Sequence, residues 1–237
     1  MPRLLLVEDA PDVALIVERL GRRLGLDVAC RADVASAWEC ARAAVPDLVL
    51  LDLNLAGERG EELCRRLRAS PETARVPVAL FVHLACGDDV VSGLEAGADY
   101  LVAKDLLGRP DEWLARLREI LPAGDGLGGR VSVSCQRNAV LPPPSPETVR
   151  ALNGALRHPL LRQLGPGVLR LVLRRADGGR RWLEPDGLAL DVGRVAASAS
   201  AGEVRAFADA VTEQAHRLLG HAAEPLREAI AAAVPGG

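Results

Sequence analysis

Five short apolar runs divide the first half of the chain. The first, third and fourth are almost continuously apolar, as is typical of parallel strands covered on both faces. The runs are Arg3–Val7, Leu26–Cys30, Asp47–Leu51, Val76–Val82 and Tyr100–Val102. We predict that each of them forms a strand.

Apolar residues with helical spacing fill the intervals between these strands. The first interval carries Val13, Ile16, Val17, Leu20 and Leu24 after Pro11, and the second carries Ala35, Trp38 and Ala41–Ala43. The later intervals carry Leu63 and Leu67, then Val90, Val91 and Leu94, then Trp113, Leu114, Leu117 and Leu121 after Pro110. Strand and helix thus alternate five times in residues 1–122, which predicts an α/β domain with a five-stranded, doubly wound parallel sheet.

The pattern changes after residue 122. Glycine and proline are frequent in residues 123–145, which we interpret as a linker with one short strand at 130–134. Residues 146–237 predict a second, mostly α-helical domain, in which Ser145, Pro146 and Glu147 are typical of a helix start. A later amphipathic helix is predicted from Val204, Phe207, Ala208, Val211, Ala215 and Leu218.

Composition narrows the classes of protein to consider. The length of 237 residues fits two domains, and a hydrophobic content of 49% is enough for packed cores. No apolar run approaches the roughly 20 residues that span a bilayer, and the first residues turn acidic too soon for a secretory signal. We therefore expect a cytoplasmic protein without membrane contact. The net charge of −3 gives no overall attraction for nucleic acid.

Charged residues follow three of the predicted strands. Glu8 and Asp9 follow the first, Asp52 follows the third, and Lys104 follows the fifth. Functional side chains collect at the carboxyl ends of parallel strands, so these four should share one cleft. Crowded carboxylates are stable only beside a cation, and Mg²⁺ suits oxygen ligands.

Lys104 is the only lysine among the 29 lysine and arginine residues. A merely solvated cation in this arginine-rich chain would most simply be arginine. A lysine suits a place where a compact, flexible ammonium must meet a phosphoryl oxygen.

Three segments, in this order, resemble the receiver domain of response regulators in two-component signalling. They are "LLLVEDAPD", "PDLVLLDLNLAGERGEEL", which includes Gly60, and "EAGADYLVAK". The resemblance covers residues 1–121 and implies a flavodoxin-like fold. A receiver domain catalyses only its own phosphorylation and dephosphorylation, so we do not class the chain as an enzyme.

The resemblance also implies a role for each residue of the cleft. Asp52 would accept the phosphoryl group from a histidine kinase or a phosphotransfer protein. Asp9, Asp52 and the backbone carbonyl of Asn54 would ligate Mg²⁺, with Glu8 acting through a water molecule. Lys104 would pair with the phosphoryl group.

Two switch positions depart from the family pattern. The family has Ser or Thr where this chain has Val82, and residues 74–91 contain neither. Valine matches threonine in shape but cannot donate a hydrogen bond. The usual aromatic residue is Leu101 here, beside Tyr100, and Ala56 and Asp105 replace the family's prolines.

We therefore expect metal binding and phosphorylation with an atypical conformational switch. The alternative is a phosphorylation-independent pseudo-receiver that acts as an adaptor. The retained Glu8, Asp9, Asp52 and Lys104 argue against it, because a discarded site has no need of repelling carboxylates.

The sequence of the C-terminal half does not indicate a specific function for the predicted helical domain. It has no convincing helix-turn-helix, and its arginines cluster only at 174–175 and 180–181, so a DNA-binding transcription regulator is the less favoured reading. The segment around His216 resembles a histidine phosphotransfer domain. However, Leu219 replaces that family's lysine and only 21 residues follow His216, so we expect a solvent-facing histidine. We interpret this half as an interaction domain, with a homodimer as one arrangement.

Overall fold

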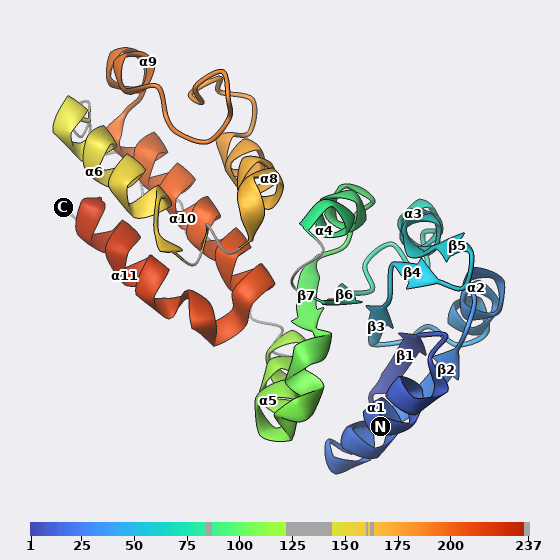
Figure 1. Ribbon diagram of the computed structural model, residues 1–237. Coiled ribbons are helices and arrows are strands. Elements are labelled where there is room, and N and C mark those ends of the chain that lie inside the picture. The colour runs from blue at the N-terminus through green and yellow to red at the C-terminus, as the bar shows by residue number, and fades with distance from the viewer. Residues whose placement is uncertain (84–86, 122–143, 160, 162–163, 235–237) are drawn as a thin grey trace. The chain divides into compact units, whose positions relative to one another are not determined.

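The structure is a computed structural model that describes residues 1–83, 87–121, 144–159, 161 and 164–234. It divides into two compact units, Met1–Arg130 and Val131–Gly237 (Figure 1). Most of the predicted linker, including the strand predicted at 130–134, lies outside the described residues. The boundaries proposed for the two domains therefore stay predictions.

The first unit contains the predicted five-stranded parallel sheet. Its strands are β1 (Arg3–Val7), β2 (Asp27–Arg31), β3 (Leu48–Leu51), β6 (Val78–Val82) and β7 (Tyr100–Ala103). They lie in the order β2-β1-β3-β6-β7, and every neighbouring pair is parallel. This flavodoxin-like order confirms the predicted fold. The order reverses beside β1 and β3, where such sheets place their binding crevice.

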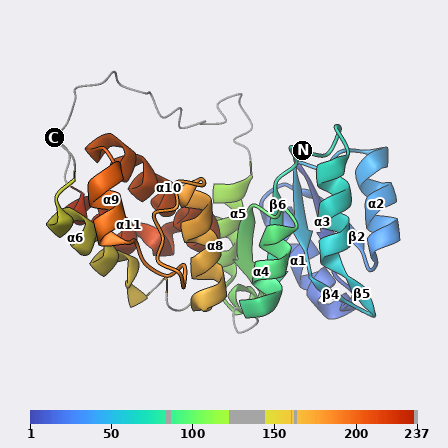
Figure 2. The same cartoon turned by 90° about the horizontal axis from the view of Figure 1, so that it is seen from above.

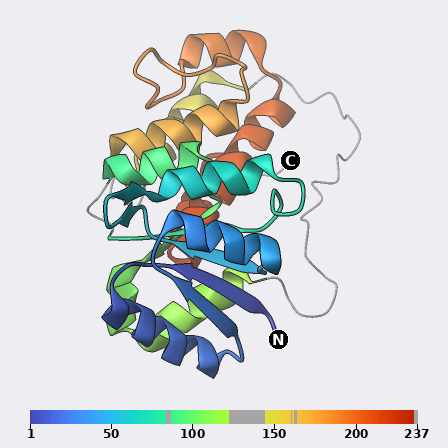
Figure 3. The same ribbon diagram turned by 90° about the vertical axis from the view of Figure 1, so that its right-hand side faces the viewer.

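Within the described residues, five helices and one 3₁₀ helix accompany the sheet. They are α1 (Pro11–Arg23), α2 (Val34–Ala43), α3 (Gly60–Ala69), α4 (Gly87–Glu95), η1 (Lys104–Gly108) and α5 (Pro110–Ile120). Helices α1 and α5 cover one face, where Val17 and Leu20 join Trp113 and Leu117 in the core (Figure 3). Helices α2, α3 and α4 lie side by side on the other face (Figure 2).

Two of the predicted helix faces were partly wrong. Ile16 of α1 is 40% exposed. In α2 the buried residues are Val34, Ala37 and Ala41, while Ala35 and Ala43 are exposed. An alanine-rich helix has little contrast between its faces, so its sequence marks the buried face weakly.

The loop after β3 contains a small hairpin that the sequence pattern did not predict. Strands β4 (Asn54–Leu55) and β5 (Glu58–Arg59) pair antiparallel. Gly57 lies in their turn with a φ of +87°, a conformation that glycine adopts without the steric cost of a Cβ. Two-residue strands are too short to show an alternating pattern.

The second unit is mostly helical, as predicted. Its elements are α6 (Pro146–Leu156), α8 (Gly165–Asp177), α9 (Val192–Ser198), α10 (Ala201–Leu219), η2 (Gly220–Ala223) and α11 (Glu224–Ala233). Helix α10 contacts α8 and α11, and α6 contacts α9 and α11. No described helix combines the length and apolar character that a bilayer-crossing segment needs.

Local signals in the sequence account for two of these helices. Ser145 caps α6, because its Oγ accepts a hydrogen bond from the backbone N–H of Thr148 at 3.1 Å, and Pro146 occupies the first turn. All six apolar residues predicted to face inward from α10 are buried. Ser200 and Glu203 form a capping box at its start, in which each side chain satisfies a backbone N–H.

Asn153 anchors the segment between α8 and α9 to helix α6. Its Oδ1 accepts from the backbone N–H of Leu190 at 2.8 Å, and its Nδ2 donates to the carbonyl of Leu190 at 2.9 Å. One side chain thus satisfies both backbone groups of a buried residue.

We predict that Asn153→Leu lowers the free energy of unfolding of the second unit by about 1–3 kcal/mol, because it leaves two buried backbone groups without partners. Chemical denaturation of the full chain would measure this change. Arg150→Ala, at an exposed position of the same helix, is the control and should change the value by no more than about 0.5 kcal/mol. Equal losses in both variants would contradict the anchoring role.

Candidate functional site

The charged residues predicted to form the site lie just beyond the ends of the strands, on one face of the sheet. On the face that packs against α1 and α5, β1 contributes Leu4 and Leu6, β3 contributes Leu48 and Leu50, and β7 contributes Val102. Side chains alternate along a strand with a period of two. The next residues on that face are therefore Glu8, Asp52 and Lys104. The core thus ends in a row of charges at the carboxyl edge of the sheet.

Lys104 joins the two buried carboxylates of this row. Its Nζ lies 2.5 Å from Oδ2 of Asp52 and 2.7 Å from Oε2 of Glu8. Glu8 and Asp52 are buried, and the lysine side chain is only 12% exposed. The ammonium also lies 5.4 Å from the centre of the Phe81 ring. The structure therefore brings together residues that follow β1, β3 and β7 and are far apart in the sequence.

Asp9 completes a carboxylate cluster. One oxygen from each of Glu8, Asp9 and Asp52 lies within 4.8 Å of the others, close enough to share one metal ion. Asp9 is exposed, and its Oδ2 accepts a hydrogen bond from the backbone N–H of Ala56 at 3.1 Å. Three carboxylates and one ammonium leave two negative charges, which a divalent cation would offset. The donor set therefore suits a hard divalent ion.

Asn54 lies beside this cluster, in β4. Its backbone N–H donates to Oδ1 of Asp52 at 3.1 Å, and its side-chain Nδ2 donates to Oδ2 of Asp89 at 3.2 Å. One oxygen of Asp52 is thus held by the backbone and the other by Lys104. The orientation of this carboxylate is fixed from both sides.

The pKa values of Glu8 and Lys104 are both raised, but for different reasons. Burial raises the pKa of Glu8, and the neighbouring charge of Asp52 adds to this effect, while Lys104 opposes both without cancelling them. Burial alone would lower the pKa of Lys104. Its hydrogen bonds to Asp52 and Glu8, and their charges, outweigh that effect and raise the pKa of Lys104. The lysine is therefore held in its charged form.

The two predicted switch positions are buried on the opposite face of the sheet. Val82 ends β6 and pairs in register with Ala103 of β7. Leu101 is buried as well, and its carbonyl accepts from Nε and Nη2 of Arg116, both at 3.2 Å. Neither side chain offers a hydrogen-bonding group to the edge of the sheet.

A polar network that sequence reasoning missed ties α4 to α3. Glu61 is buried, and its Oε1 accepts from Oγ of Ser92 at 2.6 Å and from Nη2 of Arg59 at 2.5 Å. Burial alone would raise the pKa of Glu61, but these two donors outweigh it and lower the pKa. A glutamate in the first turn of a helix is usually exposed, so the sequence offered no reason to predict the contacts of Glu61 with Ser92 and Arg59.

Glycine is required where α3 begins. A Cβ on Gly60 would lie 2.3 Å from the carbonyl oxygen of Asp52 and 3.0 Å from Cα of Leu53. The backbone N–H of Gly60 donates to the carbonyl of Leu53 at 3.0 Å. The close approach of α3 therefore supports the backbone that carries Asp52.

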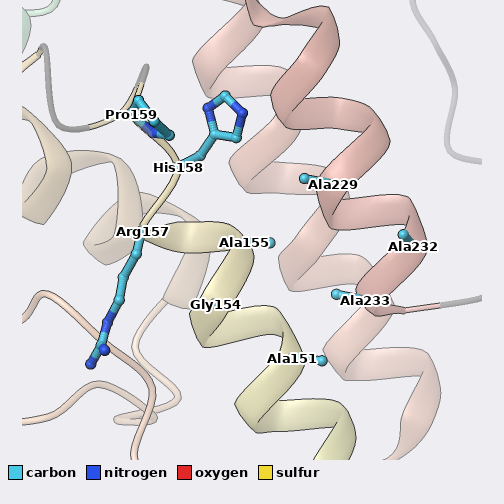
Figure 4. A pocket seen from close by; sticks show the side chains of 9 residues that line it. All are labelled: Ala151, Gly154, Ala155, Arg157, His158, Pro159, Ala229, Ala232 and Ala233. Carbon is cyan, nitrogen blue, oxygen red and sulfur yellow. The ribbon is translucent and has the colours of Figure 1, made fainter.

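An open depression of about 510 Å³ in the second unit lies between α6 and α11 (Figure 4). Alanine side chains of the two helices line most of it, with Arg157 and His158 at the C-terminal end of α6. Elsewhere in this unit, His216 lies exposed on α10, as predicted. Among the described residues, only Glu8, Asp9 and Asp52 form a cluster of three groups close enough to share a metal ion.

Comparison with known proteins agrees with this geometry for the first unit. The family model of the response regulator receiver domain matches residues 4–118. Residues 4–118 are a receiver domain. No family model matches the C-terminal half.

Relatives of the receiver domain occur in several bacteria. The DNA-binding response regulator MtrA of Mycolicibacterium smegmatis is 40% identical over 116 residues, which are 49% of this chain and 49% of that protein. The transcriptional regulatory protein AfsQ1 of Streptomyces coelicolor is 38% identical over 125 residues, 53% of each chain. A crystal structure of a putative response regulator from Chloroflexus aurantiacus matches with a TM-score of 0.48 and 31% identity, covering 52% of this chain and all of that one. The chain thus spans about half the length of the curated relatives it matches.

We predict that Lys104→Met keeps the fold but lowers the free energy of unfolding by roughly 3 kcal/mol, because two buried carboxylates lose their cation. The loss should shrink at acidic pH, where the carboxylates take up protons, and a divalent cation should recover part of it. Denaturation at pH 7 and pH 4.5 would measure both effects. A variant as stable as the wild type at pH 7 would contradict the coupling.

We predict that Gly60→Ala lowers the free energy of unfolding by about 1–3 kcal/mol, because the new Cβ displaces the backbone of Asp52. Gly108→Ala is the matched control, since a Cβ there meets no atom within 4 Å. Thermal denaturation of both variants would compare them. Similar midpoints for the two would refute the close approach.

Proposed function

We propose that the chain is a two-component response regulator whose receiver domain accepts a phosphoryl group on Asp52. The donor would be the phosphohistidine of a histidine kinase or a phosphotransfer protein. The observation that carries the proposal is the contact of Lys104 with Asp52 and Glu8, together with Asp9 within 4.8 Å. Mg²⁺ is the ion that we assign to the carboxylates, with the carbonyl of Asn54 as a further ligand.

Asp52 is the nucleophile in this proposal. One of its carboxylate oxygens attacks phosphorus, the bond from phosphorus to the histidine nitrogen breaks, and the imidazole leaves. Bound Mg²⁺ would supply charge that offsets the phosphoryl oxygens. The backbone N–H of Asn54 holds Oδ1 of Asp52 during the attack. Positioning and charge compensation, rather than a separate acid or base, carry the transfer.

Lys104 changes partners in this reaction. Before transfer its ammonium contacts the carboxylates of Glu8 and Asp52. Once Asp52 carries the phosphoryl group as an acyl phosphate, its carboxyl group is no longer charged, and the phosphoryl oxygens become the anionic partners of the ammonium. A flexible lysine can follow the charge without moving its backbone.

We further propose that the response to phosphorylation is atypical. Val82 cannot donate a hydrogen bond to the phosphoryl group, and neither can Leu101, which is buried in β7 and pairs with Leu80. The hydrogen bond between Ser92 and Glu61 holds α4 against α3, and the one between Asn54 and Asp89 holds α4 against the loop after β3. These features also support the alternative of a phosphorylation-independent adaptor, which keeps the receiver fold for protein contact.

The second unit serves, in this proposal, as the output part of a cytoplasmic protein. MtrA is described as a DNA-binding response regulator, but it matches only about half of this chain, so DNA binding is the second candidate for the output. We favour a protein-interaction role, including a homodimer through the helical unit, because its clustered arginines are exposed and accompanied by acidic residues such as Glu184 and Asp186.

We predict that the purified chain gains one phosphoryl group when incubated with acetyl phosphate and Mg²⁺, and that Asp52→Asn gains none. The intact mass of both proteins would be compared. Beryllofluoride, which mimics a phosphoryl group, should raise the melting temperature of the wild type alone.

Three other results would change the proposal. A wild type that gains no mass and does not respond to beryllofluoride would favour the adaptor. A phosphoryl group gained by the Asn variant would place the acceptor elsewhere. Binding of a DNA duplex that weakens with salt would support the second candidate for the output.

A further inference from the structure

His83 belongs to the same row of residues as the charged site. On the core face, β6 contributes Ala79 and Phe81, and the next position with a period of two is His83. The corresponding positions after β1, β3 and β7 are Glu8, Asp52 and Lys104. The row is therefore completed by a histidine.

The strand order places His83 between Asp52 and Lys104. Strand β6 lies between β3, which leads to Asp52, and β7, which leads to Lys104. Lys104 reaches across the end of β6 to contact Asp52 at 2.5 Å. Neighbouring strands are about 4.8 Å apart, so the backbone of His83 lies about one strand spacing from the strands on either side.

Asp105 holds one nitrogen of the His83 ring. Nδ1 of His83 lies 3.1 Å from Oδ1 of Asp105, and both side chains are more than half exposed. An ionised carboxylate only accepts hydrogen bonds, so Nδ1 carries the proton of this contact. In the neutral ring, Nε2 then presents its lone pair to solvent.

We propose that His83 is a general base for hydrolysis of the acyl phosphate on Asp52, with Asp105 as its positioning residue. This inference rests on the proposed phosphorylation of Asp52. Nε2 takes a proton from a water molecule while the water oxygen bonds to phosphorus. The bond from phosphorus to the Asp52 oxygen breaks, and Asp52 leaves as a carboxylate beside inorganic phosphate. The imidazolium then returns its proton to solvent.

The other members of the row are committed to different tasks. Lys104 pairs with Glu8 and Asp52, and the backbone N–H of Ala56 holds Asp9, which lies next to the row. Val82, at the end of the same strand, has no polar group. His83 is thus the member of the row with a nitrogen placed to accept a proton from water. Its exposure gives water direct access.

The test follows the loss of the phosphoryl group after loading. The full chain is phosphorylated with acetyl phosphate and Mg²⁺, the donor is removed, and the release of inorganic phosphate is timed. We expect His83→Ala to slow release by about a hundredfold, at the low end of the effect of general bases, and Asp105→Asn to slow it less. Added imidazole should restore part of the rate in His83→Ala. His216→Ala, at an exposed histidine of the other unit, should release phosphate at the wild-type rate.

Two results would overturn the inference. An unchanged rate in His83→Ala would show that the ring takes no part in hydrolysis. A faster rate would assign His83 a stabilising hydrogen bond to the phosphoryl group instead. If the wild type takes up no phosphoryl group from acetyl phosphate, the proposed function itself is overturned. This outcome is distinct from failure of the inference, which shows only in the rate of phosphate release.

Discussion

The contact of one ammonium with two buried carboxylates is the interaction on which the first unit depends. The Nζ atom of Lys104 lies within 2.7 Å of carboxylate oxygens of both Glu8 and Asp52, and the three residues follow the ends of three different strands. Without it, the carboxyl edge of the sheet would hold three mutually repelling carboxylates, two of them buried. The attraction between opposite charges is much stronger in a buried site than on the surface. Removing one partner of a buried ion pair therefore lowers the stability of the fold strongly. The same charges that must be balanced for stability are those that chemistry at the site would use.

The alternation of the strands explains why the site lies where it does. The core face of β1, β3, β6 and β7 is apolar for two successive positions and then becomes polar where each strand leaves the sheet. The site is thus the continuation of the core into solvent. Its geometry follows from the register of four parallel strands. The opposite face ends in Val82 and carries Leu101, so one face of the sheet ends in the charged cluster and the other in apolar residues.

Much of the first unit could be predicted because its signals are strong. Continuous apolar runs give buried parallel strands, and the charges that follow them must meet at one edge, so Glu8, Asp9, Asp52 and Lys104 could be placed together from the sequence. The β4–β5 hairpin was too short for any periodic signal, and the buried face of α2 was obscured by its alanines. The contact of Glu61 with Ser92 could not be predicted, because it depends on how closely two helices approach. His83 was overlooked because its role depends on the register of β6 and on Asp105.

The most direct measurement is a calorimetric titration of Mg²⁺ into the wild-type chain and into Asp9→Asn. Asp9 is exposed and contacts the rest of the protein through the N–H of Ala56, so this change should leave the fold intact. We predict one Mg²⁺ per chain in the wild type and at least tenfold weaker binding in the variant, since the variant loses one of the two carboxylates that ligate the ion directly. Equal affinity in the two proteins, or no binding in either, would contradict the assignment of the carboxylate cluster as a cation site.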